Sequence, residues 1–260
     1  VNGIGMTILT PITKYMSHVP LAIRERKPSS ALIICFGMGT TFRSAVSWGV
    51  ETTAIELVPS VREAFGFYFK DAPAILKKPN ARIIVDDGRR FLKRSSKKFD
   101  IITIDPPPPV ESAGSSLLYS VEFYQILKPR LKDDGILAQW FPNGEKMTFK
   151  AIVKSLSVVF PYLRVFHSVE DWGFHFFASN QPFEMPKVKD FVKRLPAAAS
   201  FDLVEWNPDK TPAQLYEELL KREIPLAEIL TSDVNCLVTD DRPFNEYFWA
   251  RRTWYKLTGR

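Results

Sequence analysis

The sequence has only two cysteines in 260 residues and no apolar run near the roughly 18 residues that a membrane-spanning helix needs. Cys35 falls inside a predicted strand, which argues against a disulfide framework and favours a reducing compartment, so we expect a cytoplasmic protein. No signal peptide is visible. The chain begins at Val1 instead of Met, which leaves open that it is a piece of a longer protein.

The sequence also lacks the residue patterns of several kinds of site. His167 and His175 have no cysteine or carboxylate at ligand spacing, so we expect no metal. No Ser-His-Asp or Cys-His signature is present. The net charge of +6 favours an anionic partner, but the basic residues are dispersed and have no interleaved aromatics. A solvated basic surface and no nucleic-acid partner are therefore predicted.

What the sequence does contain is an alternation of short apolar runs and helical patterns between Ala31 and Asp105. This alternation predicts βαβ units around a mostly parallel sheet with helices on both faces, an α/β fold. Each predicted strand ends at a glycine turn or at a carboxylate, and such ends border one cleft in an open sheet. The four strands are residues 31–36, 52–56, 82–86 and 99–105, and they end at Gly37, Glu56, the Asp86-Asp87 pair and Asp105.

The glycine turn after the first strand is not a complete nucleotide-binding motif. Gly37 and Gly39 are present, but Phe42 occupies the third glycine position of a dinucleotide fingerprint, and a P-loop is absent. We therefore expect a nucleoside without phosphate, held by Glu56 on its ribose hydroxyls and by Asp87-Gly88 on the amino edge of a purine. S-adenosyl sulfonium compounds are the obvious class. The alternative is ordinary βα turns with helix-capping acids.

The chain resembles the polyamine aminopropyltransferases, the spermidine synthase-like proteins, from about residue 1 to residue 179. The segments that carry the resemblance are residues 32–39, 55–58, 84–88, 99–106, 116–124 and 131–137. It implies a Rossmann-like class I methyltransferase fold whose edge is closed by an antiparallel strand pair. It also implies transfer of an aminopropyl group from decarboxylated S-adenosylmethionine to a small-molecule amine. The segment 239–248 resembles a bacterial branch in which this domain often follows a multi-pass membrane segment, so the chain could be the cytosolic domain of a membrane-tethered protein.

Asp105 is the predicted catalytic residue, because a carboxylate can bind a cationic amine and accept its proton. It precedes prolines 106–109, which start a stiff loop, and residues 110–116 could form a lid over the cleft. The resemblance also implies acids and a Tyr-His pair around the amine. This sequence has other residues at those positions, namely Pro108, Met38, Ser115 and Ile12-Thr13.

These differences keep two classes of function open. One is an aminopropyltransferase with weak activity on putrescine. The other is a methyltransferase-fold protein with a changed reaction, such as an S-adenosylmethionine-dependent methyltransferase, or a non-catalytic nucleoside-binding module. His18 lies beside an apolar helix face, and we interpret it as a packing residue.

We divide the chain into an N-terminal segment (1–28), a Rossmann-like nucleoside-binding domain (29–180) and a C-terminal helical extension packed on it (181–260). Residues 1–7 could be a hairpin strand, and Thr10-Pro11 a helix start. Thr239–Pro243 is either an ion network or, more simply, an anchoring turn. The aromatic C-terminal residues could pack on the domain, meet a second subunit in a homodimer, or contact a membrane-linked partner.

Other predicted elements are a helix from Ser120 to Leu131, a strand at 135–140, a helix at 147–159, an antiparallel pair at 162–168 and 173–179, and a helix from a capping box at 211–214 to about Arg222.

Overall fold

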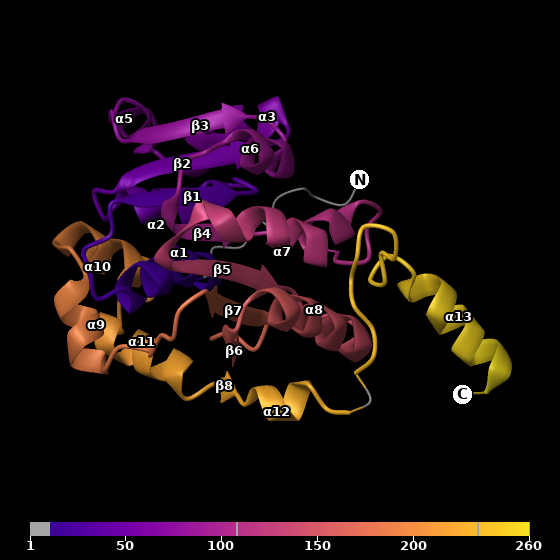
Figure 1. Ribbon diagram of the computed structural model, residues 1–260. Coiled ribbons are helices and arrows are strands. Elements are labelled where there is room, and N and C mark those ends of the chain that lie inside the picture. Colours follow the sequence, from indigo (N-terminus) through magenta and orange to yellow (C-terminus); the bar gives the residue numbers. More distant parts are fainter. Residues whose placement is uncertain (1–10, 108, 233, 260) are drawn as a thin grey trace.

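The computed structural model describes residues 11–107, 109–232 and 234–259. Its centre is an eight-stranded sheet in the order β3-β2-β1-β4-β5-β7-β6-β8 (Figure 1). Neighbouring strands among β1 to β5 run parallel, and β7, β6 and β8 add antiparallel pairs. The strands are β1 Ser30–Ile34, β2 Glu51–Glu56, β3 Ala81–Val85, β4 Phe99–Ile104, β5 Leu131–Phe141, β6 Tyr162–His167, β7 Phe174–Ser179 and β8 Glu223–Ile224.

Helices cover both faces of the sheet, as the α/β prediction requires. In β1, Ala31 and Ile33 pack into one hydrophobic cluster, and Leu32 and Ile34 pack into the other. This alternation follows from the two-residue period of a strand, and it explains why a strand buried on both faces is apolar throughout. The helices are α1 Ile12–Ile23, α2 Thr40–Val46, α3 Pro59–Glu63, α4 Phe65–Tyr68, α5 Ala72–Leu76, α6 Gly88–Arg94, α7 Val121–Leu127, α8 Lys146–Val159, α9 Val188–Arg194, α10 Ala197–Val204, α11 Pro212–Leu220, α12 Leu226–Ile229 and α13 Phe248–Thr258.

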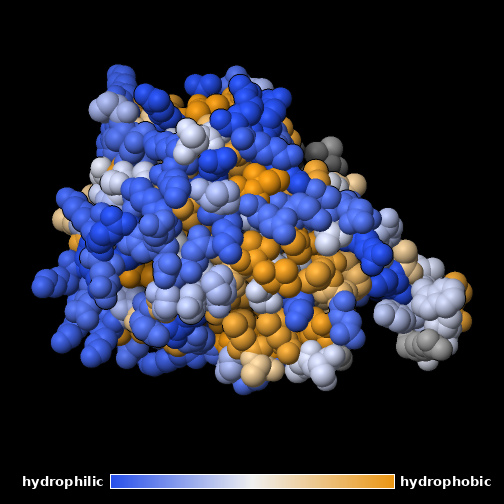
Figure 2. Space-filling view, viewed as in Figure 1, coloured by the Kyte–Doolittle hydropathy of each residue, from blue (hydrophilic) through white to orange (hydrophobic). Residues whose placement is uncertain are grey.

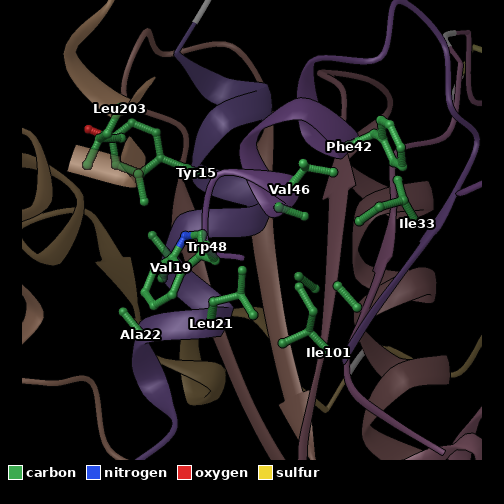
Figure 3. Close-up of a cluster of buried hydrophobic side chains, with 14 of the residues drawn as sticks. Tyr15, Val19, Leu21, Ala22, Ile33, Phe42, Val46, Trp48, Ile101 and Leu203 are labelled. Atoms are coloured by element: carbon green, nitrogen blue, oxygen red, sulfur yellow. The ribbon is translucent and has the colours of Figure 1, made fainter. Parts of the chain in front are cut away.

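The first cluster joins the N-terminal helix to the C-terminal half of the chain. Figure 3 shows Val19 of α1 beside Trp48, and Tyr15 of α1 beside Leu203 of α10. The Tyr15 hydroxyl donates to the Leu215 carbonyl oxygen at 2.7 Å. Helix α1 is therefore buried between the sheet and the segment formed by α9, α10 and α11.

Asp202 of α10 is the centre of a buried polar network in the same region. Its Oδ2 contacts His18 Nε2 at 2.7 Å and accepts the Ser44 hydroxyl at 2.6 Å. Lys14 and Arg43 form ion pairs with its Oδ1. These cations and hydrogen bonds hold the pKa of Asp202 well below its usual range despite its burial. The interpretation of His18 as a packing residue is confirmed, because it lies in this network.

Several predicted boundaries were wrong for local reasons. The first strand ends at Ile34, because Cys35 adopts a left-handed conformation with φ of 69° and starts the turn. Helix α2 is preceded by Gly39 and has no side-chain cap. Helix α7 ends at Leu127 and a 3-10 turn follows, because Leu131 already belongs to β5. Its cap was predicted correctly, since the Ser120 hydroxyl oxygen accepts the Phe123 N–H at 3.1 Å.

The antiparallel pair β6 and β7 was predicted, but it does not form the edge of the sheet. The short strand β8 pairs outside β6, with Val165 opposite Ile224. Two residues with no apolar alternation give no sequence signal of their own, which is why the C-terminal segment was expected to be helical only. The capping box at Thr211 and Gln214 is present and opens α11.

The segment 239–243 is an anchoring turn. Asp240 accepts from Arg89 Nη1 at 2.8 Å and from the Ser120 hydroxyl at 2.7 Å, and its N–H donates to Glu122 at 3.0 Å. These bonds tie the C-terminal arm to α6 and α7.

After this turn, α13 extends away from the sheet (Figure 1), and Arg251 in its first turns pairs with Glu145 next to α8. Trp249, Trp254 and Tyr255 are exposed. These three aromatics therefore do not pack on the domain, whereas Phe244 packs against the second hydrophobic cluster. The first of the three alternatives holds for Phe244 and is wrong for the exposed side chains. Figure 2 shows hydrophilic side chains over much of the surface, with hydrophobic ones reaching it in the centre of the view, where Figure 1 has α7 and α8. Within the described ranges, no helix is both long and apolar enough to cross a membrane. The predicted hairpin strand and Thr10 lie outside the described residues.

Candidate active site

A cavity of about 680 Å³ lies at the carboxyl ends of the parallel strands. All predicted site residues except Gly39 line it, which confirms that the strand ends border one cleft. The sheet order spreads them in a line: the Asp86-Asp87 pair after β3, Glu56 at the end of β2, the glycine turn after β1, and Asp105 after β4. One end of the cavity is therefore formed by β2 and β3, and the other by β4 and β5.

The glycine turn has the conformation that its glycines predict. Gly37 and Gly39 have φ values of 54° and 89°, in the left-handed region that favours glycine. A Cβ on Gly39 would lie 2.5 Å from the Phe65 ring, so a side chain there would displace the packing under the turn. A Cβ on Gly37 would meet nothing within 4 Å. Gly37 therefore borders the cavity directly, whereas Gly39 supports the turn from behind.

Glu56 is buried at the end of β2 and faces this turn. Its Oε1 accepts the Val58 N–H at 2.9 Å, and its Oε2 accepts the Gly37 N–H at 3.3 Å. Two backbone donors hold the carboxylate in one orientation. Each of its oxygens keeps a lone pair for a further donor, so the pair can accept two neighbouring hydroxyls from a ligand.

The two acids after β3 have different structural roles. Asp86 pairs with Arg90, which lowers its pKa. Asp87 accepts the Arg90 backbone N–H at 2.7 Å and is the N-cap of α6. The helix-capping alternative is therefore correct for Asp87, yet both residues also line the cavity. Gly88, the next residue, packs closely against β1, since a Cβ there would lie 2.6 Å from Ile34 Cγ2.

Asp105 has a raised pKa, whereas the pKa of Asp86 in the same cavity is lowered. Burial raises the pKa of Asp105 to about 6, and the Thr41 hydroxyl, which donates to Oδ2 at 3.3 Å, opposes this rise. The Thr41 hydroxyl also lies 3.1 Å from the Thr13 carbonyl oxygen. Within the described residues no cation pairs with Asp105, in contrast to Asp86. A carboxylate with a raised pKa, in a cavity, is suited to accept a proton near neutral pH.

The loop after Asp105 is held at both ends by the C-terminal arm. Asn245 is fully buried, and its Nδ2 donates to the Val110 carbonyl oxygen at 2.6 Å and to the Ser115 hydroxyl at 2.8 Å. Residues 112–114 between these points are exposed, and they line the cavity. The loop thus lies over the cavity as predicted, whereas its movement stays a prediction. Pro108 lies outside the described residues.

Sequence reasoning missed the aromatic wall of the cavity. Trp140 is the last residue but one of β5 and lies next to Asp105, because the β4–β5 register pairs Ile104 with Gln139. The Trp172 ring packs edge to face on Trp140, with 5.4 Å between centroids. Trp140 could have been found as the end of the fifth strand. Trp172 lies in a loop between β6 and β7 and carries no local signal. Cys35, expected inside a strand, also lines the cavity, and burial raises the pKa of its thiol.

Comparison with known proteins decides the family. The sequence profile of the spermine/spermidine synthase domain matches residues 10–169, more than half of the chain. The chain belongs to the spermine/spermidine synthase family. A polyamine aminopropyltransferase of Thermotoga maritima is 29% identical over 210 residues, which cover 74% of this chain and 70% of the relative.

Solved structures agree with this fold. A spermidine synthase in complex with the transition state analogue AdoDATO has a TM-score of 0.63 at 23% identity, and the match covers 84% of this chain and 74% of that chain. The Thermotoga maritima spermidine synthase has a TM-score of 0.62 at 23% identity, and the match covers 84% of this chain and 73% of that chain. Human methyltransferase-like protein 13 in complex with SAH has a TM-score of 0.55 at 17% identity and covers 74% of this chain and 89% of its own. The Rossmann-like class I methyltransferase fold is confirmed. In the described residues, no group of three or more His, Cys, Asp or Glu side chains could hold a metal ion.

Proposed function

We propose that this chain transfers an aminopropyl group from decarboxylated S-adenosylmethionine to a small-molecule amine, with Asp105 as the base. Membership of the spermine/spermidine synthase family makes it a transferase. The observation that carries the proposal is a carboxylate with a pKa raised to about 6, in the same cavity as an acid and a glycine turn suited to a nucleoside.

In this reaction the nitrogen lone pair of the amine forms a bond to the propyl carbon next to the sulfonium. The carbon–sulfur bond breaks, and its electron pair goes to sulfur, so that neutral methylthioadenosine leaves. An amine with a pKa near 10 is mostly protonated at neutral pH and cannot attack. Asp105 removes that proton and holds it until it passes to solvent. A base whose pKa lies near the operating pH does this better than an ordinary aspartate.

Binding of the donor is assigned to the other end of the cavity. Glu56 would accept the two ribose hydroxyls, because its carboxylate is already oriented by Val58 and Gly37. Asp86, Asp87 and Gly88 would lie along the base. Gly37 would let the ligand approach the backbone, and Gly39 would keep the turn in place.

The test is a product assay by mass spectrometry with decarboxylated S-adenosylmethionine and a panel of primary amines. Methylthioadenosine and the aminopropylated amine should form together in equal amounts. The second candidate, methyl transfer from S-adenosylmethionine, is favoured by the apolar end of the cavity, which has few acids for a polyamine. In that case S-adenosylhomocysteine should form instead. If neither product forms and a nucleoside binds tightly, the chain is a non-catalytic nucleoside-binding module.

A homodimer and a cytoplasmic location are part of this proposal. The exposed aromatic side chains of α13 support a contact with a second copy. Light scattering of the chain with and without residues 244–260 tests the first, and cell fractionation of the full-length protein tests the second. An upstream membrane segment stays a sequence-based expectation.

A further inference from the structure

The two ends of the cavity differ in chemistry. Three acids, Glu56, Asp86 and Asp87, line the end formed by β2 and β3. At the end formed by β4 and β5, Asp105 is the single carboxylate among the described lining residues. Its surroundings there are mostly apolar, and they comprise Ile12, Leu117, Leu118, Trp140 and Trp172.

These apolar residues contact one another and form one wall of the cavity, called the apolar wall below. Ile12 and Trp140 share a small hydrophobic cluster with Met16, and Trp172 packs against it. Leu118 is fixed beside β5, because its carbonyl oxygen accepts Gln139 Nε2 at 2.9 Å. The wall therefore comes from α1, β5, the loop between β6 and β7, and the 3-10 turn at Ser115–Leu118, and it is built from packed side chains.

The other acids around this wall, Glu111, Glu170 and Glu246 among them, are not among the residues that line the cavity. Glu246 accepts the Ser116 N–H at 3.1 Å. Asp171, which precedes Trp172, pairs with Arg222. Glu145, after β5, pairs with Arg251. The ten residues before the described part contain no Asp or Glu, so they cannot supply a carboxylate.

The charge of the reactants sets a limit on what this end can accept. The donor of the proposed reaction brings a sulfonium and a terminal ammonium. The attacking amine is neutral once Asp105 has taken its proton. A diamine would add a distal ammonium against the apolar wall, and burying an unpaired charge is expensive. The faces of Trp140 and Trp172 attract a cation more weakly than a carboxylate does.

We propose that the acceptor is a primary monoamine with an apolar body, an alkylamine or arylalkylamine, whose body packs on Trp140, Trp172 and Ile12. This rests on the proposed function, because it names the acceptor of the same reaction. The apolar body gains by leaving water, and it needs no anion at its far end. Putrescine, which is 1,4-diaminobutane, is then a poor acceptor.

The experiment compares 1,4-diaminobutane with n-pentylamine, which has a methyl group in place of the second ammonium and is otherwise matched in length. Release of methylthioadenosine is measured at saturating decarboxylated S-adenosylmethionine, and 2-phenylethylamine is the aromatic probe. We expect kcat/KM for the two monoamines to exceed that for the diamine by about ten-fold or more, which corresponds to about 1.4 kcal/mol. Equal or faster reaction of the diamine overturns this inference and leaves the proposed function standing. No release with any amine overturns the proposed function and the inference with it.

A charge placed in the wall gives the second measurement. Trp172→Asp and Trp172→Asn remove the same aromatic ring, and only the first adds a carboxylate. We expect the ratio of kcat/KM for diaminobutane to that for pentylamine to be about ten-fold higher in the Asp variant than in the Asn variant. Calorimetric binding of methylthioadenosine checks that both variants are folded. Equal ratios in the two variants would contradict the charge argument.

Discussion

Asp105 should destabilise the ligand-free protein at the pH where it works. Its pKa is raised from the ordinary value of 3.8 to about 6, because burial disfavours the charged form. A raised pKa of a carboxylate means that the folded state binds more protons than the unfolded state between these two values. Stability therefore falls as the pH rises from about 3.8 to about 6, and the full penalty is present above that range.

The size of the penalty follows from the shift. Each pKa unit corresponds to about 1.36 kcal/mol, so Asp105 costs at most about 3 kcal/mol above pH 6. Asp105→Asn removes the charge and keeps an oxygen that can accept the Thr41 hydroxyl. We expect this variant to be more stable than the parent by up to about 3 kcal/mol at pH 8, and by clearly less at about pH 5.

Urea unfolding of the ligand-free protein at both pH values measures the difference. Asp100→Asn is the matched control, because Asp100 is a buried acid of β4, the strand that leads to Asp105, but Lys132 and Ser29 lower its pKa. The control should lose stability at neutral pH, and less as the pH falls. The reasoning is refuted if Asp105→Asn is less stable than the parent at pH 8, or if its gain is the same at both pH values.

The same substitution tests the base. General base catalysis contributes about 10²- to 10⁴-fold, so product formation by Asp105→Asn should fall by about that factor. The rate of the parent should also fall as the pH drops through about 6, where Asp105 becomes protonated. A stabilised variant that keeps full activity would show that Asp105 is buried for another reason.

Three further predictions concern the neighbouring elements. Glu56→Gln should weaken methylthioadenosine binding by roughly ten- to hundred-fold, since hydrogen bonds to a charged acceptor contribute about 1.5–3 kcal/mol; calorimetry measures it, and unchanged affinity would remove Glu56 from the ribose site. Limited proteolysis should cut the loop at the exposed residues 112–114 and be suppressed by nucleoside, whereas equal cleavage in both conditions would exclude a lid that orders on binding. Asp202→Asn should lower the free energy of unfolding by about 1.5–3 kcal/mol at neutral pH, because the contacts of His18 and Ser44 with a charged oxygen are weakened, while Lys14 keeps its ion pair with Glu205 at 2.6 Å. Because the pKa of Asp202 is lowered, the difference should shrink in acid, and a difference that does not change with pH would contradict this role.

The strands of the parallel half could be predicted because each is an apolar run followed by a glycine turn or an acidic residue that marks its end. Leu32–Ile34 is apolar on both faces, Phe99–Ile104 is mostly apolar, and the Gly-x-Gly turn and an acid mark their ends. The boundary at Cys35 could not be predicted, since a non-glycine residue in the left-handed region depends on the tertiary contacts around the turn. The strand β8 forms only because β6 presents an unpaired edge to it.

The site was predictable where chemistry lies at the end of a strand. Glu56, Asp87 and Asp105 were found in this way and lie in one cavity. The apolar wall was not, because Ile12, Trp140 and Trp172 come from a helix, a strand and a loop that are far apart in the sequence. An apolar residue in a binding site looks like any core residue until the fold places it. The partner of His18 was hidden for the same reason, since Asp202 is 184 positions away.

That distance along the chain has a consequence for synthesis. Lys14 and Asp202 are separated by 188 residues, and a ribosome that adds about 5–20 residues per second needs roughly 10–40 s to make the intervening chain. During this time α1 has left the ribosome without α10, so Lys14 and the Nε2 atom of His18 lack Asp202, although Trp48, which donates to Nδ1 of His18, has already been made. Helix α1, the first helix of the described chain, is therefore among the last to reach its native surroundings, and a nascent chain that stops before residue 202 has no native place for it.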